Sequence, residues 1–128
     1  MPHLLVHALE NDLDGREADL IAALTEAVVA VYGDWARDIA VVQLLGYPAG
    51  RWGIGGKPAE APAPRVTFGI RDGVFSRPEA ADILGGLAAG VTDAIATVIG
   101  EHVRAGVTIE FVGAPDGRTA VAGTLVES

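Results

Sequence analysis

The first half of the chain contains three successive patterns of apolar and polar positions. Apolar and polar residues alternate over positions 2–9, a short stretch that is typical of a half-buried strand. The next apolar residues recur every three or four positions, which predicts one face of a helix ending at Gly33: Leu20, Leu24, Val28 and Val31. Residues 39–45 then form a run that is apolar except for Gln43 and rich in β-branched side chains, which predicts a buried strand.

The second half of the chain repeats this order of patterns. Residues 65–71 are predicted to form a strand, residues 78–99 a helix and residues 107–112 a second strand. Ser76 comes shortly before Pro78, a combination that favours a helix start. Two strands joined by a crossover helix should lie parallel, with a right-handed connection.

A shared motif indicates that the two halves arose by duplication. Residues 46–56 and 113–123 both follow the pattern G-x-P-x-G-R-x-x-(I/V)-x-G, in register with the preceding helix. We therefore divide the single domain of residues 1–128 into two repeats, 2–56 and 64–126. The linker, residues 57–63, contains alternating prolines, which are incompatible with a helix or a central strand.

Composition narrows the classes of protein to which this chain can belong. The 128 residues are 50% apolar and 20% charged, enough for one domain with a substantial core or interface. The net charge of −8 and the lack of any Lys/Arg-rich run argue against nucleic acid as a partner. Without cysteine, disulfides and thiol chemistry are excluded. No secretory signal is visible, and Asp, Glu or Gly interrupts the apolar stretches, so we expect a soluble cytoplasmic protein that does not enter a membrane.

Pro2, directly after Met1, is the strongest candidate for chemistry. A small second residue favours removal of the initiator methionine, which would leave Pro2 with a free secondary amine. A main-chain amine has a pKa near ~8, and burial lowers it further. Such a group can act as a base or nucleophile near neutral pH. The alternative is an ordinary proline at position 2.

Two local motifs give the chain its resemblance to a known family. The opening P-x-x-x-x-H-x-L-E, from Pro2 to Glu10, and the later W-G-I-G-G, from Trp52 to Gly56, resemble the tautomerase superfamily, the group of 4-oxalocrotonate tautomerase. The internal repeat resembles its fused branch, which includes malonate semialdehyde decarboxylase and cis-3-chloroacrylic acid dehalogenase. The resemblance implies an α/β fold in which tandem β-α-β units form a mixed four-stranded sheet with two helices on one face. Pro64, the counterpart of Pro2, is internal and has no N–H.

The resemblance also assigns roles to individual residues. Pro2 would be the catalytic base, and Arg71 would hold a substrate carboxylate through its bidentate guanidinium. Arg77 is the nearest candidate for a second arginine, Trp52 would form an apolar wall, and Asp38 would position water or substrate. Each has an ordinary structural alternative: solvated arginines, a core-filling tryptophan, and an aspartate ahead of a strand near Arg37.

Three functions remain open at this point. The first is cofactor-independent keto–enol tautomerisation of a small 2-keto or 2-hydroxydienoic carboxylate. The second is hydration, dehalogenation or decarboxylation with protonated Pro2 as the acid, and the third is a scaffold without activity. The short family has arginines where Asp12 and Ala40 or Val41 lie here, which favours a monocarboxylate or a keto acid with an apolar tail over a dicarboxylate. Six β-α-β units complete the family's ring, so the resemblance implies a homotrimer; the scattered histidines predict no metal site.

Overall fold

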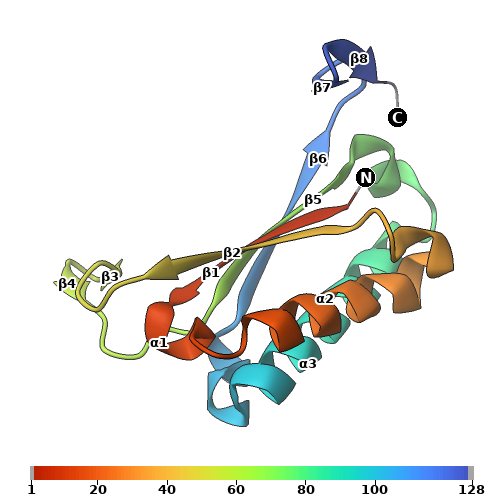
Figure 1. Cartoon of the computed structure of the whole chain (residues 1–128). Helices are drawn as coiled ribbons and strands as arrows, with labels where there is room; N and C mark the ends of the chain where they lie inside the picture. Colours follow the sequence, from red (N-terminus) through yellow and green to blue (C-terminus); the bar gives the residue numbers. More distant parts are fainter. Residues whose placement is uncertain (1, 127–128) are drawn as a thin grey trace.

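A four-stranded sheet with helices on one side forms the body of the molecule. The structure, a computed structural model, describes residues 2–126. The sheet has the order β2-β1-β5-β6, with these bounds: β1 His3–Leu9, β2 Val41–Tyr47, β5 Arg65–Arg71 and β6 Thr108–Ala114. The two long helices, α2 (Glu17–Tyr32) and α3 (Ala80–Ile99), lie side by side on the same face of the sheet (Figure 1).

The pairing of the strands confirms the predicted mixed α/β fold. β1 runs parallel to β2, and β5 runs parallel to β6, as expected for strands joined by a crossover helix. The central strands β1 and β5 run antiparallel, with His3 opposite Gly69 and His7 opposite Arg65. The start of β1 therefore lies beside the end of β5.

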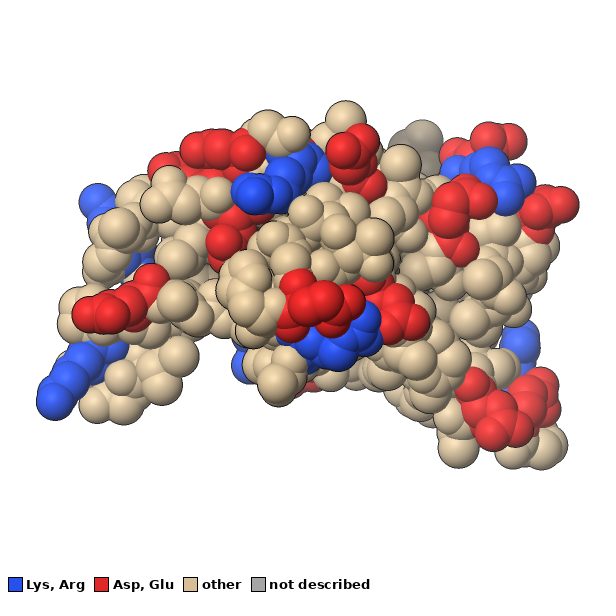
Figure 2. All heavy atoms as spheres, turned by 90° about the horizontal axis from the view of Figure 1, so that it is seen from below, with Lys and Arg blue, Asp and Glu red and all other residues tan. Residues whose placement is uncertain are grey.

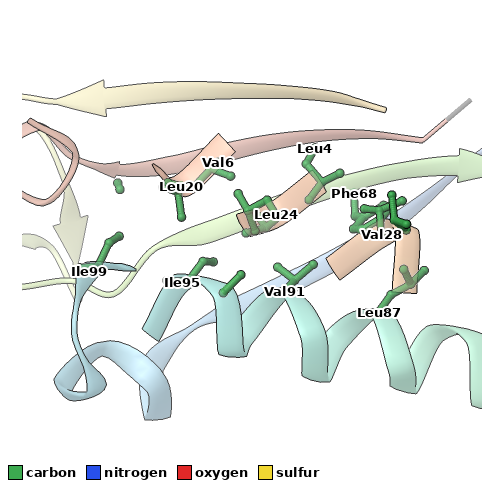
Figure 3. Packing of buried hydrophobic residues seen from close by; sticks show 14 of the residues in the cluster. Leu4, Val6, Leu20, Leu24, Val28, Phe68, Leu87, Val91, Ile95 and Ile99 are labelled. Atoms are coloured by element: carbon green, nitrogen blue, oxygen red, sulfur yellow. The ribbon is translucent and has the colours of Figure 1, made fainter. Parts of the chain in front are cut away.

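The core lies between the sheet and the two helices (Figure 3). Alternate residues of the two central strands are fully or almost fully buried: Leu4, Val6, Ala8, Val66, Phe68 and Ile70. The helices contribute side chains at helical spacing, all completely buried: Leu20, Leu24, Val28, Leu87, Val91 and Ile95. Burial of this many apolar side chains is the main term that stabilises the fold. Within residues 2–126, no helix or strand covers the opposite face of the sheet.

The strand predicted as buried over residues 39–45 differs in the structure. Ile39 lies in a turn, the strand runs from Val41 to Tyr47, and it forms an edge of the sheet. Its side chains alternate between partly covered and exposed, with Val41 at 40% and Leu45 at 45% exposure. The prediction was wrong because an apolar run does not reveal which face of a sheet the helices cover. In a single chain, one face of this strand stays bare.

Short elements connect and extend the two repeats. Short helices follow strands or long helices: α1 Glu10–Leu13, η1 Asp34–Ala36, η2 Asp72–Ser76 and η3 Glu101–Gly106. Two hairpins project from the sheet: β3 Gly53–Ile54 with β4 Lys57–Pro58, and β7 Thr119–Val121 with β8 Thr124–Val126. The first hairpin thus takes in the first two residues of the predicted linker. The helix predicted from residue 78 begins at Ala80.

Matching ion pairs outside the core support the internal duplication. In the first repeat, Arg37 forms ion pairs with Glu26 and Asp34. In the second repeat, Arg104 forms ion pairs with Asp93 and Glu101, and each of these residues lies 67 positions after its counterpart. Hydrogen bonding to each arginine lowers the pKa of Glu26 and of Glu101. The helix side of the molecule carries acidic and basic side chains in such mixed groups, with no continuous field of one sign (Figure 2).

Helix α3 departs from the expectation that every apolar stretch is too short for a membrane. Its 20 residues, Ala80–Ile99, are long and apolar enough to cross one by length and composition alone. In this fold α3 packs as a core helix, with Leu87, Val91 and Ile95 completely buried. Its exposed side carries small or polar residues, such as Ala89, Asp93 and Thr97. The small residues therefore account for much of its apolar composition.

Candidate active site

Pro2 lies in a pocket at one end of the sheet. Its side chain is buried, and its carbonyl oxygen accepts a hydrogen bond from the Val41 backbone N–H at 3.1 Å. The adjoining hollow, here called the Pro2 pocket, has a volume of about 280 Å³ and is lined by Pro2, Tyr32, Trp35, Ile70, Arg71, Val74 and Arg77. Met1, whose removal the sequence predicts, lies outside the described residues.

The topology explains why these residues meet. β1 begins where the antiparallel strand β5 ends, which places Arg71, the last residue of β5, beside Pro2. Helix α2 runs back along the sheet, so its last residue, Tyr32, reaches the same end. The turn η2 follows β5 directly and leads to Arg77. Both repeats therefore contribute to the Pro2 pocket, and Pro2, Arg71 and Arg77 come together as the sequence suggested.

The Pro2 pocket is positively charged. Within residues 2–126, neither Arg71 nor Arg77 forms an ion pair, and none of the lining residues is a carboxylate. Burial raises the pKa of the Tyr32 phenol above its ordinary value, although the positive charge of Arg77 acts in the opposite direction. The phenol is thus protonated at neutral pH. The pocket offers two guanidinium groups and one hydroxyl to an anionic ligand.

An aromatic wall flanks the Pro2 pocket. The Tyr32 and Trp35 rings lie 5.8 Å apart, and the Trp35 indole N–H donates a hydrogen bond of 2.7 Å to the Tyr32 carbonyl. Trp35 is 59% exposed, so it borders the mouth of the pocket. Our sequence reasoning missed both residues. The sequence did contain a signal for both residues, because in a parallel β-α-β unit the end of the helix lies at the same end of the sheet as the start of the first strand.

Trp52 does not reach the Pro2 pocket of its own chain. Because β1 and β2 are parallel, the residues that follow β2 lie at the opposite end of the sheet from Pro2. There Trp52 contacts Tyr47 and lines a different hollow with His7. Seven residues of strand, roughly 23 Å at the usual rise per residue, separate the two ends. Within one chain, the apolar wall beside Pro2 consists of Tyr32 and Trp35 instead.

Asp38 also lies outside the Pro2 pocket. It is exposed in the turn between η1 and β2, and it is not among the lining residues. Arg37, considered above as its possible partner, pairs with Glu26 and Asp34 instead. Among the described residues, no group of three or more His, Asp or Glu side chains could hold a metal ion.

Comparison with known proteins gives matches among solved structures. No family model matches the chain, and no curated protein matches its sequence. A fused 4-OT that forms an asymmetric trimer is 27% identical, with a TM-score of 0.79 over 96% of this chain and 94% of that one. A second, native fused 4-OT is 24% identical, with a TM-score of 0.81 over 96% and 94%. A cis-3-chloroacrylic acid dehalogenase family member is 20% identical, with a TM-score of 0.70 over 97% and 82%. The similarity over almost the whole chain, together with the tandem β-α-β repeat, places this chain in the tautomerase superfamily, in its fused two-unit form.

Proposed function

We propose that this protein is a cofactor-independent keto–enol tautomerase that acts on a small 2-keto or 2-hydroxydienoic carboxylate. One observation carries the proposal: a single pocket combines Pro2 with Arg71 and Arg77, two arginines that have no acidic partner in residues 2–126. A carboxylate substrate would supply that partner. An unpaired guanidinium is suited to this role because it can donate two parallel hydrogen bonds to a carboxylate.

In the proposed reaction, the neutral amine of Pro2 removes a proton from the carbon next to the substrate carbonyl and returns it to the enolate oxygen. For a substrate that enters as the 2-hydroxy enol, Pro2 takes the hydroxyl proton and delivers it to carbon. Arg71 holds the carboxylate. Arg77 and the protonated Tyr32 hydroxyl stabilise the negative charge that develops on the enolate oxygen. The two nearby positive charges favour the neutral, basic form of the amine.

The wall of the Pro2 pocket favours a substrate with a flat, conjugated tail. Tyr32 and Trp35 present aromatic surface there, and Ile70 and Val74 add apolar surface. Planar groups pack well against such rings. Both arginines of the Pro2 pocket belong to the second repeat. The volume of the pocket, about 280 Å³, limits the size of the substrate.

Hydration, dehalogenation or decarboxylation is the second candidate, and the paired arginines favour it. Arg71 and Arg77 provide the arginine pair that the dehalogenase and the decarboxylase are expected to use. Those reactions also call for a carboxylate that activates water, yet Asp38 lies outside the Pro2 pocket. Tautomerisation therefore remains first. Parallel assays with phenylenolpyruvate, 3-chloroacrylate and malonate semialdehyde would separate them, since dehalogenation releases chloride, decarboxylation releases CO2 and tautomerisation releases neither.

Removal of Met1 is the first requirement of either reaction. We expect the intact mass of the purified protein to lack one methionine, because proline follows Met1 in the sequence. An amide nitrogen is not basic, so Pro2 can act only after this cleavage. A mass that includes Met1 would contradict both catalytic candidates and favour a scaffold without activity.

We also expect a homotrimer. Apolar side chains lie exposed on the uncovered side of the sheet, including Val41, Leu45 and Val112, and on the hairpins at Ile54 and Leu125. Proteins in solution rarely leave such surfaces and strand edges open. One of the similar fused 4-OT structures is an asymmetric trimer. Light scattering should give a mass of about three chains, and a monodisperse monomer would contradict this prediction.

A substitution next to the Pro2 pocket tests whether the turn η2 positions the arginines. Gly113 packs against η2 so closely that an added Cβ would lie 2.8 Å from the Phe75 ring and 3.1 Å from the Asp72 Cα. We expect Gly113→Ala to lower the free energy of unfolding by ~1–3 kcal/mol, as overpacking does. It should also lower kcat/KM by roughly tenfold or more, because displacing η2 displaces Arg71 and Arg77.

Gly46 offers a matched control. It is the counterpart of Gly113 in the first repeat, and an added Cβ there would lie 2.9 Å from the Glu10 side chain, at the other end of the sheet. Gly46→Ala should destabilise the fold less, because the nearest backbone atom, the Glu10 Cα, lies 3.6 Å from the added Cβ, and it should cause no comparable loss of activity. Equal losses of activity in both variants would show that general destabilisation, not the position of η2, causes the effect.

A further inference from the structure

The turn η1 follows helix α2 at the Pro2 end of the sheet (Figure 1). It contains Trp35, which borders the mouth of the Pro2 pocket. The chain reverses at Gly33, whose φ of 106° lies in a region that side chains rarely adopt, and a Cβ added there would lie 3.4 Å from Trp35 Cδ1. Because η1 packs against α2, Trp35 lies on the helix side of the sheet, away from the uncovered face that we expect other chains to cover.

Two contacts join Trp35 to Tyr32, the last residue of α2. The indole N–H donates a hydrogen bond of 2.7 Å to the Tyr32 carbonyl, one of the carbonyl groups at a helix end that have no partner within the helix. The two rings also pack together, with centroids 5.8 Å apart and planes at 44°. More than half of the Trp35 surface stays exposed. A substrate tail that extends from Arg71 toward solvent would therefore pass the indole.

Arg37 fixes the turn η1 against α2. Its Nε and one terminal nitrogen each donate a hydrogen bond of 2.9 Å to a different carboxylate oxygen of Glu26, which lies on α2. The other terminal nitrogen donates a bond of 3.2 Å to Asp34, the first residue of η1. A single exposed ion pair contributes little, but bidentate pairs and networks of this kind are the exception. The Arg37 ion pairs thus hold Trp35 beside Tyr32.

The second repeat forms the same turn without the tryptophan. There η3 is held by the ion pairs of Arg104, which match those of Arg37, and it too follows a glycine with a positive φ, Gly100 at 143°. His102 lies at the position that matches Trp35. The turn and its ion pairs therefore belong to the shared fold, whereas the indole at the pocket mouth is a feature of the first repeat alone.

We propose that Trp35 determines which tails the Pro2 pocket accepts, by packing against the aromatic ring of an aryl-substituted 2-keto or enol carboxylate, and that Arg37 is the residue that positions it. The inference rests on the proposed function, in which Arg71 holds the carboxylate end of the same ligand. A ligand without a ring keeps its pair with Arg71 but loses the contact with the indole. Discrimination between tails therefore depends on Trp35, and proton transfer depends on Pro2.

The first test compares two substrates, phenylenolpyruvate with a ring and 2-hydroxypentadienoate without one. Trp35→Leu keeps an apolar side chain but lacks the flat ring. We expect it to lower the ratio of the two kcat/KM values about three- to tenfold, mainly through KM for phenylenolpyruvate. Trp35→Phe, which keeps a ring, should retain most of the ratio. A purely structural role would lower kcat/KM equally for both substrates and leave the ratio unchanged.

The second test asks whether Arg37 acts through Trp35. Arg37→Ala should lower the same ratio by at least about twofold, because a small displacement of a contacting group is enough to weaken its effect. Arg104→Ala removes the matching ion pairs at the opposite end of the sheet and should leave the ratio unchanged. In a Trp35→Leu background, Arg37→Ala should have no further effect on the ratio, since residues that act through one another are not additive.

Calorimetric titration with two acids that cannot tautomerise separates the inference from the proposed reaction. Trp35→Leu should weaken binding of 3-phenylpropanoate about three- to tenfold and binding of 3-cyclohexylpropanoate by less, because only the first has a flat ring. If this holds but neither substrate is turned over, the proposed function is wrong and the role of Trp35 stands. The inference is overturned by an unchanged ratio in Trp35→Leu, by equal weakening of both acids, or by an effect of Arg37→Ala that persists without Trp35.

Discussion

Replacing Pro2 by alanine is expected to lower kcat/KM for phenylenolpyruvate by at least about 10²-fold, the usual scale for a lost acid–base group. After removal of Met1, the variant would begin with a primary amine, which lacks the rigid ring geometry of the secondary amine of proline. The arginines and aromatic residues of the Pro2 pocket remain in place, so substrate binding should change less than kcat. Steady-state kinetics of the two proteins measures both quantities.

Pro64 provides the control for this experiment. It is the counterpart of Pro2 in the second repeat, is completely buried, and has no N–H because it is internal. Pro64→Ala should leave kcat close to that of the unsubstituted protein. If Pro2→Ala kept full activity, the base would have to be another residue, and the proposed mechanism would be wrong.

The fold was predictable because the sequence encodes it twice. The alternation over residues 2–9 and the helical spacing from Leu20 to Val31 each indicate one element. The second repeat shows the same order, and the rule for crossover connections then sets the parallel pairing within each repeat. The burial of β2 was harder to predict, because its apolar residues indicated a buried strand, whereas part of the strand is exposed in a single chain. Exposure of Val41 and Leu45 fits a sequence shaped also by contacts between chains.

The candidate site was predictable only where topology and motif agree. Arg71 ends a strand and Pro2 begins one, so the antiparallel central pair brings them together. Tyr32 and Trp35 carry no motif, and only the path of helix α2 places them at the Pro2 pocket. Trp52 does belong to a motif, but a motif does not specify the end of the sheet at which its residue lies.

Replacing Arg71 by alanine is expected to lower kcat/KM roughly 30- to 10³-fold. This corresponds to a loss of ~2–4 kcal/mol of transition-state stabilisation, as for loss of a desolvated charge pair. Arg71 has no ion pair in residues 2–126, so the substrate carboxylate would be its partner. Arg71→Lys should restore only part of the loss, because lysine keeps the charge but lacks the bidentate geometry. Unchanged kinetics in both variants would make Arg71 a solvated residue at the end of β5.

Comparison with Arg77→Ala then shows whether the two arginines have different roles. If Arg71 binds the carboxylate and Arg77 stabilises the enolate, Arg71→Ala should mainly raise KM and Arg77→Ala should mainly lower kcat. Arg16, which donates hydrogen bonds to the Asn11 and Asp12 carbonyls away from the Pro2 pocket, serves as the control. Arg16→Ala should change neither constant. A rise in KM alone for both Arg71 and Arg77 would assign both guanidinium groups to carboxylate binding, and stabilisation of the enolate would then rest on Tyr32.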